Sequence, residues 1–322
     1  MITCKDIAQI AGVSTATVTR AFNTSSSIKE DTRQRILQIA KEHNYTPNLA
    51  ARGLRQRMNK IVGIIVPDAS NPYYVKVAQY IERRLDYHGF RSLISFAERS
   101  ISRSLDVMQV SRVDGVIFKP DEGTPPEMIH AMQRQGTQFV QIYRHSFPNI
   151  DCVLNDNLQG AYIGTKHLMD CGHRRILFAH RETDMRVDGF WQAVEEKPEI
   201  KASCDAVVFD SNDIKNRADL KEAFERIKPS AIFAATHVVA LSVFHHLWNM
   251  GYRIPEDVSL LVNDNLDWCE TMNISVIKHP CEVLANAATD MLISRIQQTA
   301  PEQVQKQIIA PYLICRDSVR RL

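Results

Sequence analysis

The sequence predicts an N-terminal three-helix domain of the helix-turn-helix type with a hinge helix, followed by an α/β core of two doubly wound parallel-sheet lobes. Three observations predict this fold class. Two short helical patterns meet at a glycine near the N-terminus, positive charge gathers in the first sixty residues, and apolar runs then alternate with amphipathic stretches. The expected boundaries are 1–46 for the headpiece, 47–59 for the hinge helix and linker, and 60–322 for the core.

Residues 3–22 carry the pattern of two short helices. Thr3 can cap the first helix and Ser14 the second, because their hydroxyl oxygens can accept from free backbone N–H groups. Gly12 lies between them, and a third helical pattern covers about residues 32–42. Two short helices joined by a tight turn are the helix-turn-helix arrangement, in which the second helix enters the major groove of DNA.

The charge of the chain supports this interpretation. Residues 1–60 hold ten lysines and arginines against four acidic residues, a balance of +6, whereas the rest of the chain holds 29 against 33, a balance of −4. A basic end on a mildly acidic body is typical of a chain that binds the phosphate backbone with one end. A merely solvated surface would give the same count, so charge alone does not decide between the two.

The predicted hinge begins after Pro47, where Asn48 can cap a short helix that runs to Arg55. Eight residues are too few for a helix that is stable alone, because nucleation costs more than so few hydrogen bonds return. We therefore expect the segment to fold only against DNA and a partner copy. An ordinary flexible linker would not need Ala51 on a small-residue face or Leu54 among arginines.

From residue 60 onward the pattern is that of parallel sheets covered by helices. In the first lobe we expect strands at 61–66, 92–96, 115–118 and 139–142, with helices at 72–88, 100–111 and 125–135. After a bridge near 149–155 the same alternation continues to a strand at 258–262. A ligand cleft between the strand ends of the two lobes follows from this architecture.

Composition excludes several classes of protein. The 322 residues are 44% hydrophobic and 24% charged, no run approaches the roughly 20 apolar residues of a membrane span, and no secretory signal precedes the headpiece, which predicts a cytoplasmic protein. The seven scattered cysteines form no Cys-x-x-Cys pair, so free thiols are expected rather than disulfides or a metal site. Without a nucleotide-binding glycine motif or a nucleophile–base constellation, we expect no cofactor and no enzymatic activity.

The residues at 5–23, 32–33 and 44–54 resemble the headpiece of the lactose/galactose repressor family. The core stretches at 62–74 and 186–190, among others, are similar to the same family and to the periplasmic sugar-binding proteins related to it. The resemblance implies a dimeric transcriptional regulator, in most members a repressor, that binds a near-palindromic operator under the control of a small-molecule effector. It also implies a sugar or sugar derivative as effector and a role in carbohydrate metabolism. The C-terminal tail lacks leucine heptads, which favours a homodimer over a tetramer.

The resemblance assigns DNA contacts to the second helix and to the hinge. It implies that Thr15, Ala16 and Arg20 read bases, and that Leu54 wedges between base pairs in the minor groove, which would kink the duplex. Such a helix face can also be plain surface, but the spacing and the charge favour insertion into the groove. The full predicted set of DNA-binding residues is Ser14, Thr15, Ala16, Thr19, Arg20, Asn23, Asn48, Ala51, Leu54 and Arg55.

For the effector site the resemblance implies a contact from Arg186, whose planar guanidinium suits hydroxyls, carboxylates or phosphates. It implies further contacts from Asp264, Tyr73 and Tyr74, although the tyrosines can equally be edge packing and Arg186 a surface ion pair. His237, at a helix start, can bind an anionic ligand or act as a surface cap. Sugar-responsive members usually carry Asn-Asp at positions 236–237, and this departure makes a phosphorylated or acidic metabolite the alternative to a neutral sugar.

Overall fold

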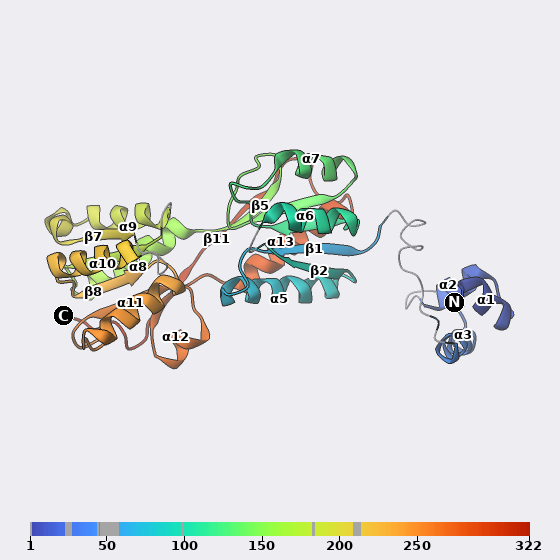
Figure 1. The fold of residues 1–322 in the computed structure, drawn as a ribbon, viewed down its shortest axis with the longest axis horizontal. Coiled ribbons are helices and arrows are strands. Elements are labelled where there is room, and N and C mark those ends of the chain that lie inside the picture. The colour runs from blue at the N-terminus through green and yellow to red at the C-terminus, as the bar shows by residue number, and fades with distance from the viewer. Residues whose placement is uncertain are drawn as a thin grey trace. The chain divides into compact units, whose positions relative to one another are not determined.

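The computed structural model describes residues 2–22, 28–43, 45, 58–97, 100–181, 184–208 and 214–322. The chain divides into two compact units, Met1–Lys60 and Ile61–Leu322 (Figure 1). Five of the predicted DNA-binding residues lie outside the described residues: Asn23, Asn48, Ala51, Leu54 and Arg55.

The headpiece has the predicted arrangement of short helices, namely α1 (Cys4–Ile10), α2 (Thr15–Ala21) and α3 (Glu30–Glu42). Thr3 caps α1 in a capping box with Asp6, and Ser14 caps α2 by accepting from the backbone N–H of Thr17 at 3.2 Å. Gly12 takes a φ of +64° in the turn between α1 and α2, a conformation that glycine adopts without strain. Local sequence therefore sets where α1 and α2 begin and how the chain turns between them.

A small apolar cluster holds the headpiece together. Its buried members come from all three helices and from the turn after α1: Ile7, Ala8, Ala11, Val18, Ala21 and Ile36. Two arginines of α3 reach across to the carbonyl groups at the ends of the other helices. Arg35 donates to the carbonyl of Ala11 at 3.1 Å, and Arg33 donates to that of Ala21 at 3.2 Å. These bonds satisfy helix carbonyls that have no partner within their own helix.

The first lobe of the core is a sheet in the order β11-β5-β4-β3-β1-β2, with every neighbouring pair parallel. Helices α5 and α13 pack on one face and α6 and α7 on the other (Figure 1). The elements are β1 (Ile61–Val66), α5 (Pro72–Tyr87), β2 (Arg91–Phe96), α6 (Ile101–Val110), β3 (Gly115–Phe118), α7 (Pro126–Arg134), β4 (Gln138–Ile142), β5 (Asp151–Asn155), α13 (Cys281–Ile296) and β11 (Lys306–Ile309).

The second lobe is a sheet in the order β12-β10-β9-β8-β6-β7, in which only β12 runs antiparallel to its neighbour. Helices α8 and α9 cover one face and α10 and α11 the other. The elements are α8 (Asn157–Asp170), β6 (Ile176–His180), α9 (Arg186–Glu195), the 3-10 helix η1 (Pro198–Ser203), β7 (Asp205–Val208), α10 (Ile214–Ile227), β8 (Ala231–Ala234), α11 (His237–Asn249), β9 (Ser259–Asn263), α12 (Asp267–Thr271), β10 (Ser275–Lys278) and β12 (Tyr312–Ile314).

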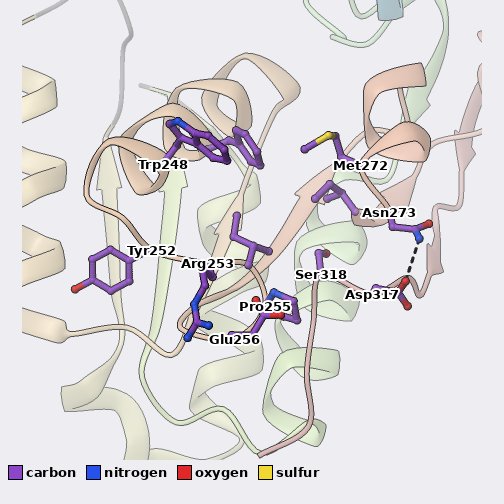
Figure 2. Close-up of a pocket in the computed structure, with 12 residues that line it drawn as sticks. Trp248, Tyr252, Arg253, Pro255, Glu256, Met272, Asn273, Asp317 and Ser318 are labelled. Atoms are coloured by element: carbon purple, nitrogen blue, oxygen red, sulfur yellow. Dashed lines mark hydrogen bonds between the residues drawn. The ribbon is translucent and has the colours of Figure 1, made fainter.

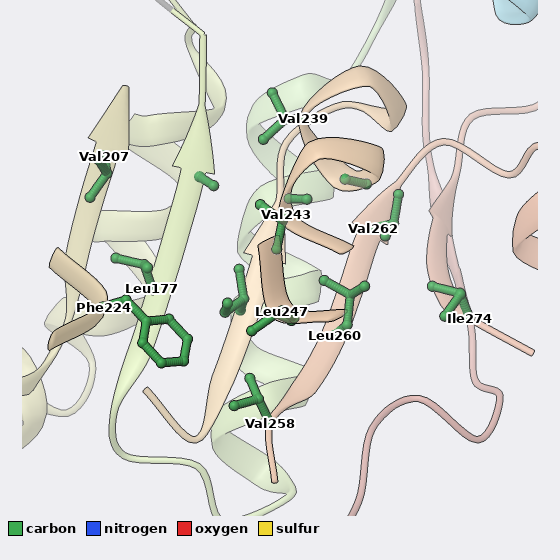
Figure 3. Packing of buried hydrophobic residues seen from close by; sticks show 14 of the residues in the cluster. Leu177, Val207, Phe224, Val239, Val243, Leu247, Val258, Leu260, Val262 and Ile274 are labelled. Atoms are coloured by element: carbon green, nitrogen blue, oxygen red, sulfur yellow. The ribbon is translucent and has the colours of Figure 1, made fainter. Parts of the chain in front are cut away.

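Each face of the second lobe buries its own apolar cluster. Figure 3 shows one of them, where Leu177 and Leu260 of the sheet pack against Val243 and Leu247 of α11. These four side chains are at most 1% exposed. The predicted fold class of two doubly wound lobes is confirmed.

The chain passes between the lobes at three places: from β5 to α8, from β10 to α13, and from β11 to β12. Only the first of these crossings is predicted by the sequence, because the predicted alternation of strands and helices ends at 258–262. The structure adds a return of α13 and β11 to the first lobe. Three connecting segments at one hinge allow the two lobes to open and close as rigid bodies.

A buried ion pair fixes this returning segment. The Asp151 carboxylate, on β5, accepts from Arg295 of α13 at 2.7 and 2.9 Å and from the backbone N–H of Gln305 at 2.8 Å. The Asp151 side chain is 3% exposed. Breaking one side of a buried pair leaves an uncompensated charge in a low-dielectric surrounding.

We therefore expect Arg295→Met to lower the free energy of unfolding by about 3–5 kcal/mol, measured by urea unfolding. The matched control is Arg253→Met, which removes the exposed pair of Arg253 with Asp257 and should change the free energy by less than about 1 kcal/mol. Equal shifts of the urea midpoint in the two variants would show that the buried pair of Arg295 and Asp151 stabilises the fold no more than the exposed pair does.

Candidate functional site

The second helix of the headpiece presents its polar residues outward. Ala16, Thr19 and Arg20 are exposed and Thr15 is half-buried, while Val18 faces the cluster between the helices. The Thr19 hydroxyl donates to the carbonyl of Thr15 at 2.9 Å. The Arg20 Nε donates to the carbonyl of Ala16 at 3.4 Å, so the arginine lies along its own helix. The described predicted DNA-binding residues thus all belong to α2 or to its N-cap, Ser14.

The core contains a cleft of about 1090 Å³ lined by residues of both lobes. It lies at the carboxyl ends of the strands, as open parallel sheets favour. Tyr73 and Tyr74 follow β1, Lys119 follows β3, and Arg181 and Asp264 follow β6 and β9 of the second lobe. Of the five predicted effector contacts, Tyr73, Tyr74, Arg186 and Asp264 line this cleft.

Two of the residues that line the cleft have a backbone conformation that is rare outside glycine. Tyr143 directly follows β4 with a φ of +67°, and Asp264 directly follows β9 with a φ of +79°. Such conformations persist only where the surrounding structure enforces them, and they gather at ligand sites. One lies in each lobe, so both lobes hold a strained residue toward the same cavity.

Three tyrosines form an aromatic cluster on the side of the first lobe. The ring centroids of Tyr73, Tyr74 and Tyr143 lie 5.2 to 5.9 Å apart. The Tyr73 hydroxyl accepts from the Nδ2 of Asn155 at 2.7 Å. Burial raises the pKa of Tyr73 and of Tyr143 well above the ordinary value. Both hydroxyls therefore stay protonated and can donate hydrogen bonds to a ligand.

An arginine and two aspartates face the cluster from the second lobe. Arg186, at the first turn of α9, donates from Nη1 to Asp184 at 3.1 Å, and both side chains are largely buried. Burial raises the pKa of the Asp264 carboxyl to about 6; nearby Arg186 opposes this shift and Asp184 adds to it. The set offers donors and acceptors for hydroxyl groups.

Several buried polar atoms near the cleft have no hydrogen-bond partner within the described part of the chain. They include Nε of Arg186 and Oδ1 of Asn155 and Asn157, which all belong to lining residues. Buried polar groups are otherwise nearly always satisfied. A polar ligand in the cleft would supply the missing partners.

His237 is placed differently from the other predicted contacts. Its ring is 4% exposed, and burial lowers the pKa of the ring, although nearby Asp68 opposes the shift. Thr236 and Val238 line the cleft, whereas His237 is absent from the lining. The cap of α11 is Thr236, which accepts from the N–H of Val239 at 3.3 Å. The interpretation of His237 as a surface cap is therefore wrong, because Thr236 caps the helix and the His237 ring is buried.

The lining of the cleft also contains basic residues that were not predicted from the sequence: Lys119, Arg144, His145, Arg181 and Lys306. The sequence pattern could have indicated Lys119, because it directly follows the buried strand predicted at 115–118, and Arg181 takes the same position after β6 (Ile176–His180). Residues at that position face the ligand crevice of such sheets.

A second, smaller pocket of about 380 Å³ lies on the second lobe and shares no lining residue with the cleft (Figure 2). Its apolar lining includes Phe244 and Trp248 of α11 and Met272 after α12. Trp248 is 72% exposed and Met272 49% exposed. Exposed apolar surface of this kind occurs where proteins contact other proteins, membranes or ligands.

The described residues lack two other kinds of functional feature, a metal-ion site and a membrane-spanning helix. No group of three or more histidine, cysteine, aspartate or glutamate side chains is arranged to hold a metal ion there. No helix in that part of the chain combines the length and the apolar character needed to cross a membrane.

The raised pKa of Asp264 predicts a pH dependence of stability. The pKa of Asp264 in the folded protein, about 6, lies above the ordinary value of 3.8. The stability that the protonated carboxyl contributes is therefore complete below about pH 4 and is lost as the pH rises through about 6. Relative to Asp264→Asn, wild type should lose about 3 kcal/mol of unfolding free energy over this window. Urea unfolding of both proteins across that range measures the difference. Parallel pH profiles would contradict the prediction.

Comparisons with known proteins agree with this two-part geometry. Residues 59–316 match the family described as periplasmic binding proteins and sugar binding domain of LacI family, and residues 3–48 match bacterial regulatory proteins, lacI family. The HTH-type transcriptional repressor PurR of Haemophilus influenzae (strain PittEE) is 27% identical over 339 residues, covering both chains fully. The HTH-type transcriptional regulator DegA of Bacillus subtilis (strain 168) is 28% identical over 341 residues, covering 99% of this chain and 98% of DegA.

Two solved structures share the fold. The lac repressor dimer bound to operator and the anti-inducer ONPF is 21% identical with a TM-score of 0.81, and the alignment covers 99% of each chain. The complex of the transcriptional regulator CelR with cellobiose is 23% identical with a TM-score of 0.70, covering 99% of this chain and 100% of that one.

Proposed function

The chain belongs to the LacI family of bacterial regulatory proteins, and we propose that it is a cytoplasmic repressor that binds a near-palindromic operator as a homodimer and responds to a small polar effector. The observation that carries the proposal is the cleft, where strained and buried polar residues of both lobes converge. The helix-turn-helix supplies the DNA-binding part.

The headpiece supports operator binding through α2. Its exposed face offers the methyl group of Ala16 and the guanidinium of Arg20, groups that meet base edges in the major groove. Ser14 and Thr19 can place the helix by contacts to phosphate oxygens. In the proposed dimer, two such helices read two half-sites, which is why the operator should be an inverted repeat.

The apolar surface of the second lobe supports a homodimer. Leu241, Trp248 and Met272 are large apolar side chains that stay exposed in the single chain (Figure 2 shows the last two). A second copy related by a two-fold axis would bury the same patch on both sides.

The effector acts by differential affinity for the open and closed arrangements of the two lobes. Proteins of the same fold hold cellobiose or ribose in their solved structures. Arg186, Asp184 and Asp264 suit the hydroxyl groups of such a ligand, which supports a sugar or sugar derivative. A phosphorylated or acidic metabolite is the second candidate, and the basic residues of the cleft favour it.

The experiment that tests the function is a selection of random duplexes by the full-length protein at moderate salt, with sedimentation to measure the oligomeric state. We expect an inverted repeat bound by a dimer. If no duplex is preferred over random DNA, with or without candidate effectors, the proposal is refuted.

A further inference from the structure

We propose that the effector is a phosphate ester, and that Lys119 and Arg144 of the first lobe and Arg181 of the second bind its phosphate group together. The inference rests on the proposed function, since it takes the cleft as the effector site. It adds the chemical class of the ligand and a reason why the ligand closes the lobes.

The three cations converge on the cleft because of topology. Lys119 directly follows β3, Arg144 lies two residues after β4, and Arg181 directly follows β6. All three line the cavity, together with Lys306 at the start of β11. The carboxyl ends of the two sheets thus present positive charge from both lobes to one ligand.

These cations have no acidic partner within the described residues. Lys119 contacts the hydroxyl of Tyr74 at 3.5 Å and lies 5.5 Å from the centre of its ring, and no ion pair is seen there for Arg144, Arg181 or Lys306. Arg186 differs, because Asp184 neutralises it. Lys119, Arg144 and Arg181 lie nearest the carboxyl ends of the strands, and no acidic side chain among the described residues pairs with them.

The acidic residues of the cleft are engaged elsewhere. Asp156 caps α8 by accepting from the N–H of Gln159 at 3.0 Å, and Asp184 is paired with Arg186. Asp264 is buried deep on the second lobe and interacts with Arg186. The lining of the cleft holds five lysine and arginine side chains against three aspartates, which is an excess of positive charge. This excess suits a phosphate that carries nearly two negative charges better than it suits a neutral sugar.

Charge of the same sign on both lobes opposes their closure while the cleft is empty of anions. A phosphate between Arg144 and Arg181 would replace this repulsion by charge-assisted hydrogen bonds to both lobes. Its affinity is then higher for the closed arrangement, which is the requirement for an effector. The rest of the ligand would contact the tyrosine cluster and the Arg186–Asp184 pair.

The first test needs no knowledge of the ligand. Binding of inorganic phosphate to the full-length protein is measured by calorimetry at constant ionic strength, for wild type and for Arg144→Gln/Arg181→Gln. The matched control is Arg103→Gln/Arg134→Gln, which removes two exposed arginines of α6 and α7 that do not line the cleft. We expect the cleft variant to weaken phosphate binding at least about tenfold and the control to stay within about twofold. Equal affinities in wild type and cleft variant, or no binding to wild type, would overturn the inference.

The second test identifies the chemical class. Ribose, ribose 5-phosphate, glucose, glucose 6-phosphate and gluconate are compared by thermal shift. We expect a phosphate ester to stabilise wild type more than its parent sugar, and the cleft variant to lose this difference. Stabilisation by gluconate alone, or by neutral sugars equally in both proteins, would refute the proposal of a phosphate ester. The proposed binding to an operator would not be affected by that result. Failure of operator selection refutes the proposed function whatever phosphate does.

Discussion

Gly189→Ala is expected to lower the free energy of unfolding of the core by about 3 kcal/mol or more. A Cβ atom at Gly189 would lie 2.1 Å from the carbonyl oxygen of Leu158 and 3.1 Å from the Cβ of Ala161. The first of these is a contact with backbone, which cannot rotate away as a side chain can. Helices α8 and α9 would have to separate by about 1 Å, and well-packed interiors resist such shifts.

The same substitution should disturb the cleft. Arg186 lies three residues before Gly189 on α9, and Asn157 and Leu158 begin α8, so the contact point of the two helices lies beside three lining residues. Moving the helices apart displaces Arg186 relative to Asp264. We therefore expect Gly189→Ala to reduce effector binding along with stability.

Urea unfolding followed by circular dichroism measures the effect, and Gly123→Ala is the matched control. Gly123 lies in the loop before α7, where an added Cβ would make only an ordinary contact of 3.5 Å with Asp121. This control should change the free energy by less than about 1 kcal/mol. Similar values for the two variants would mean that α8 and α9 are not packed as closely as the structure shows.

Much of the fold could be predicted from local sequence. The helix expected at 72–88 is α5 (Pro72–Tyr87), which begins after the Asn71 cap and ends just before His88. The expected strands at 61–66 and 115–118 have the observed bounds because their buried apolar runs are uninterrupted. Both signals depend only on neighbouring residues.

The part of the chain after residue 262 could not be predicted in this way. Strand β11 (Lys306–Ile309) is mostly exposed, lies at the edge of its sheet and has no long apolar run. Its pairing with β5 joins residues more than 150 positions apart in the sequence. Such pairing is decided by long-range packing, which a local pattern does not contain.

The candidate site also contains residues that could be predicted from the sequence and features that depend on the three-dimensional structure. Tyr73, Arg186 and Asp264 were identified by resemblance, and the structure brings them to one cleft. Their partner Asp184 and the strained Tyr143 went unrecognised, since an ion pair and a positive φ appear only in three dimensions. The assignment of roles to these residues stays a prediction until ligand binding is measured.

Arg20→Ala is expected to reduce affinity for the selected operator by about 10- to 100-fold while changing affinity for random duplex much less. An arginine that reads a guanine by two hydrogen bonds contributes about 1–3 kcal/mol of discrimination. Arg20 is exposed on α2 and is not part of the buried cluster of the headpiece. Alanine is a strong helix former, so α2 should remain folded.

The measurement is a pair of salt titrations on operator and random duplex for wild type, Arg20→Ala and Lys41→Ala. Lys41 is an exposed basic residue at the end of α3, so its removal gives the same loss of charge away from α2. The control should lose affinity equally on both duplexes, because a phosphate contact carries no sequence information. If Arg20→Ala behaves in the same way, Arg20 binds phosphate, and base reading falls to the smaller side chains of α2. If instead the operator preference collapses only in Arg20→Ala, the arginine reads a base from the groove, as proposed for α2.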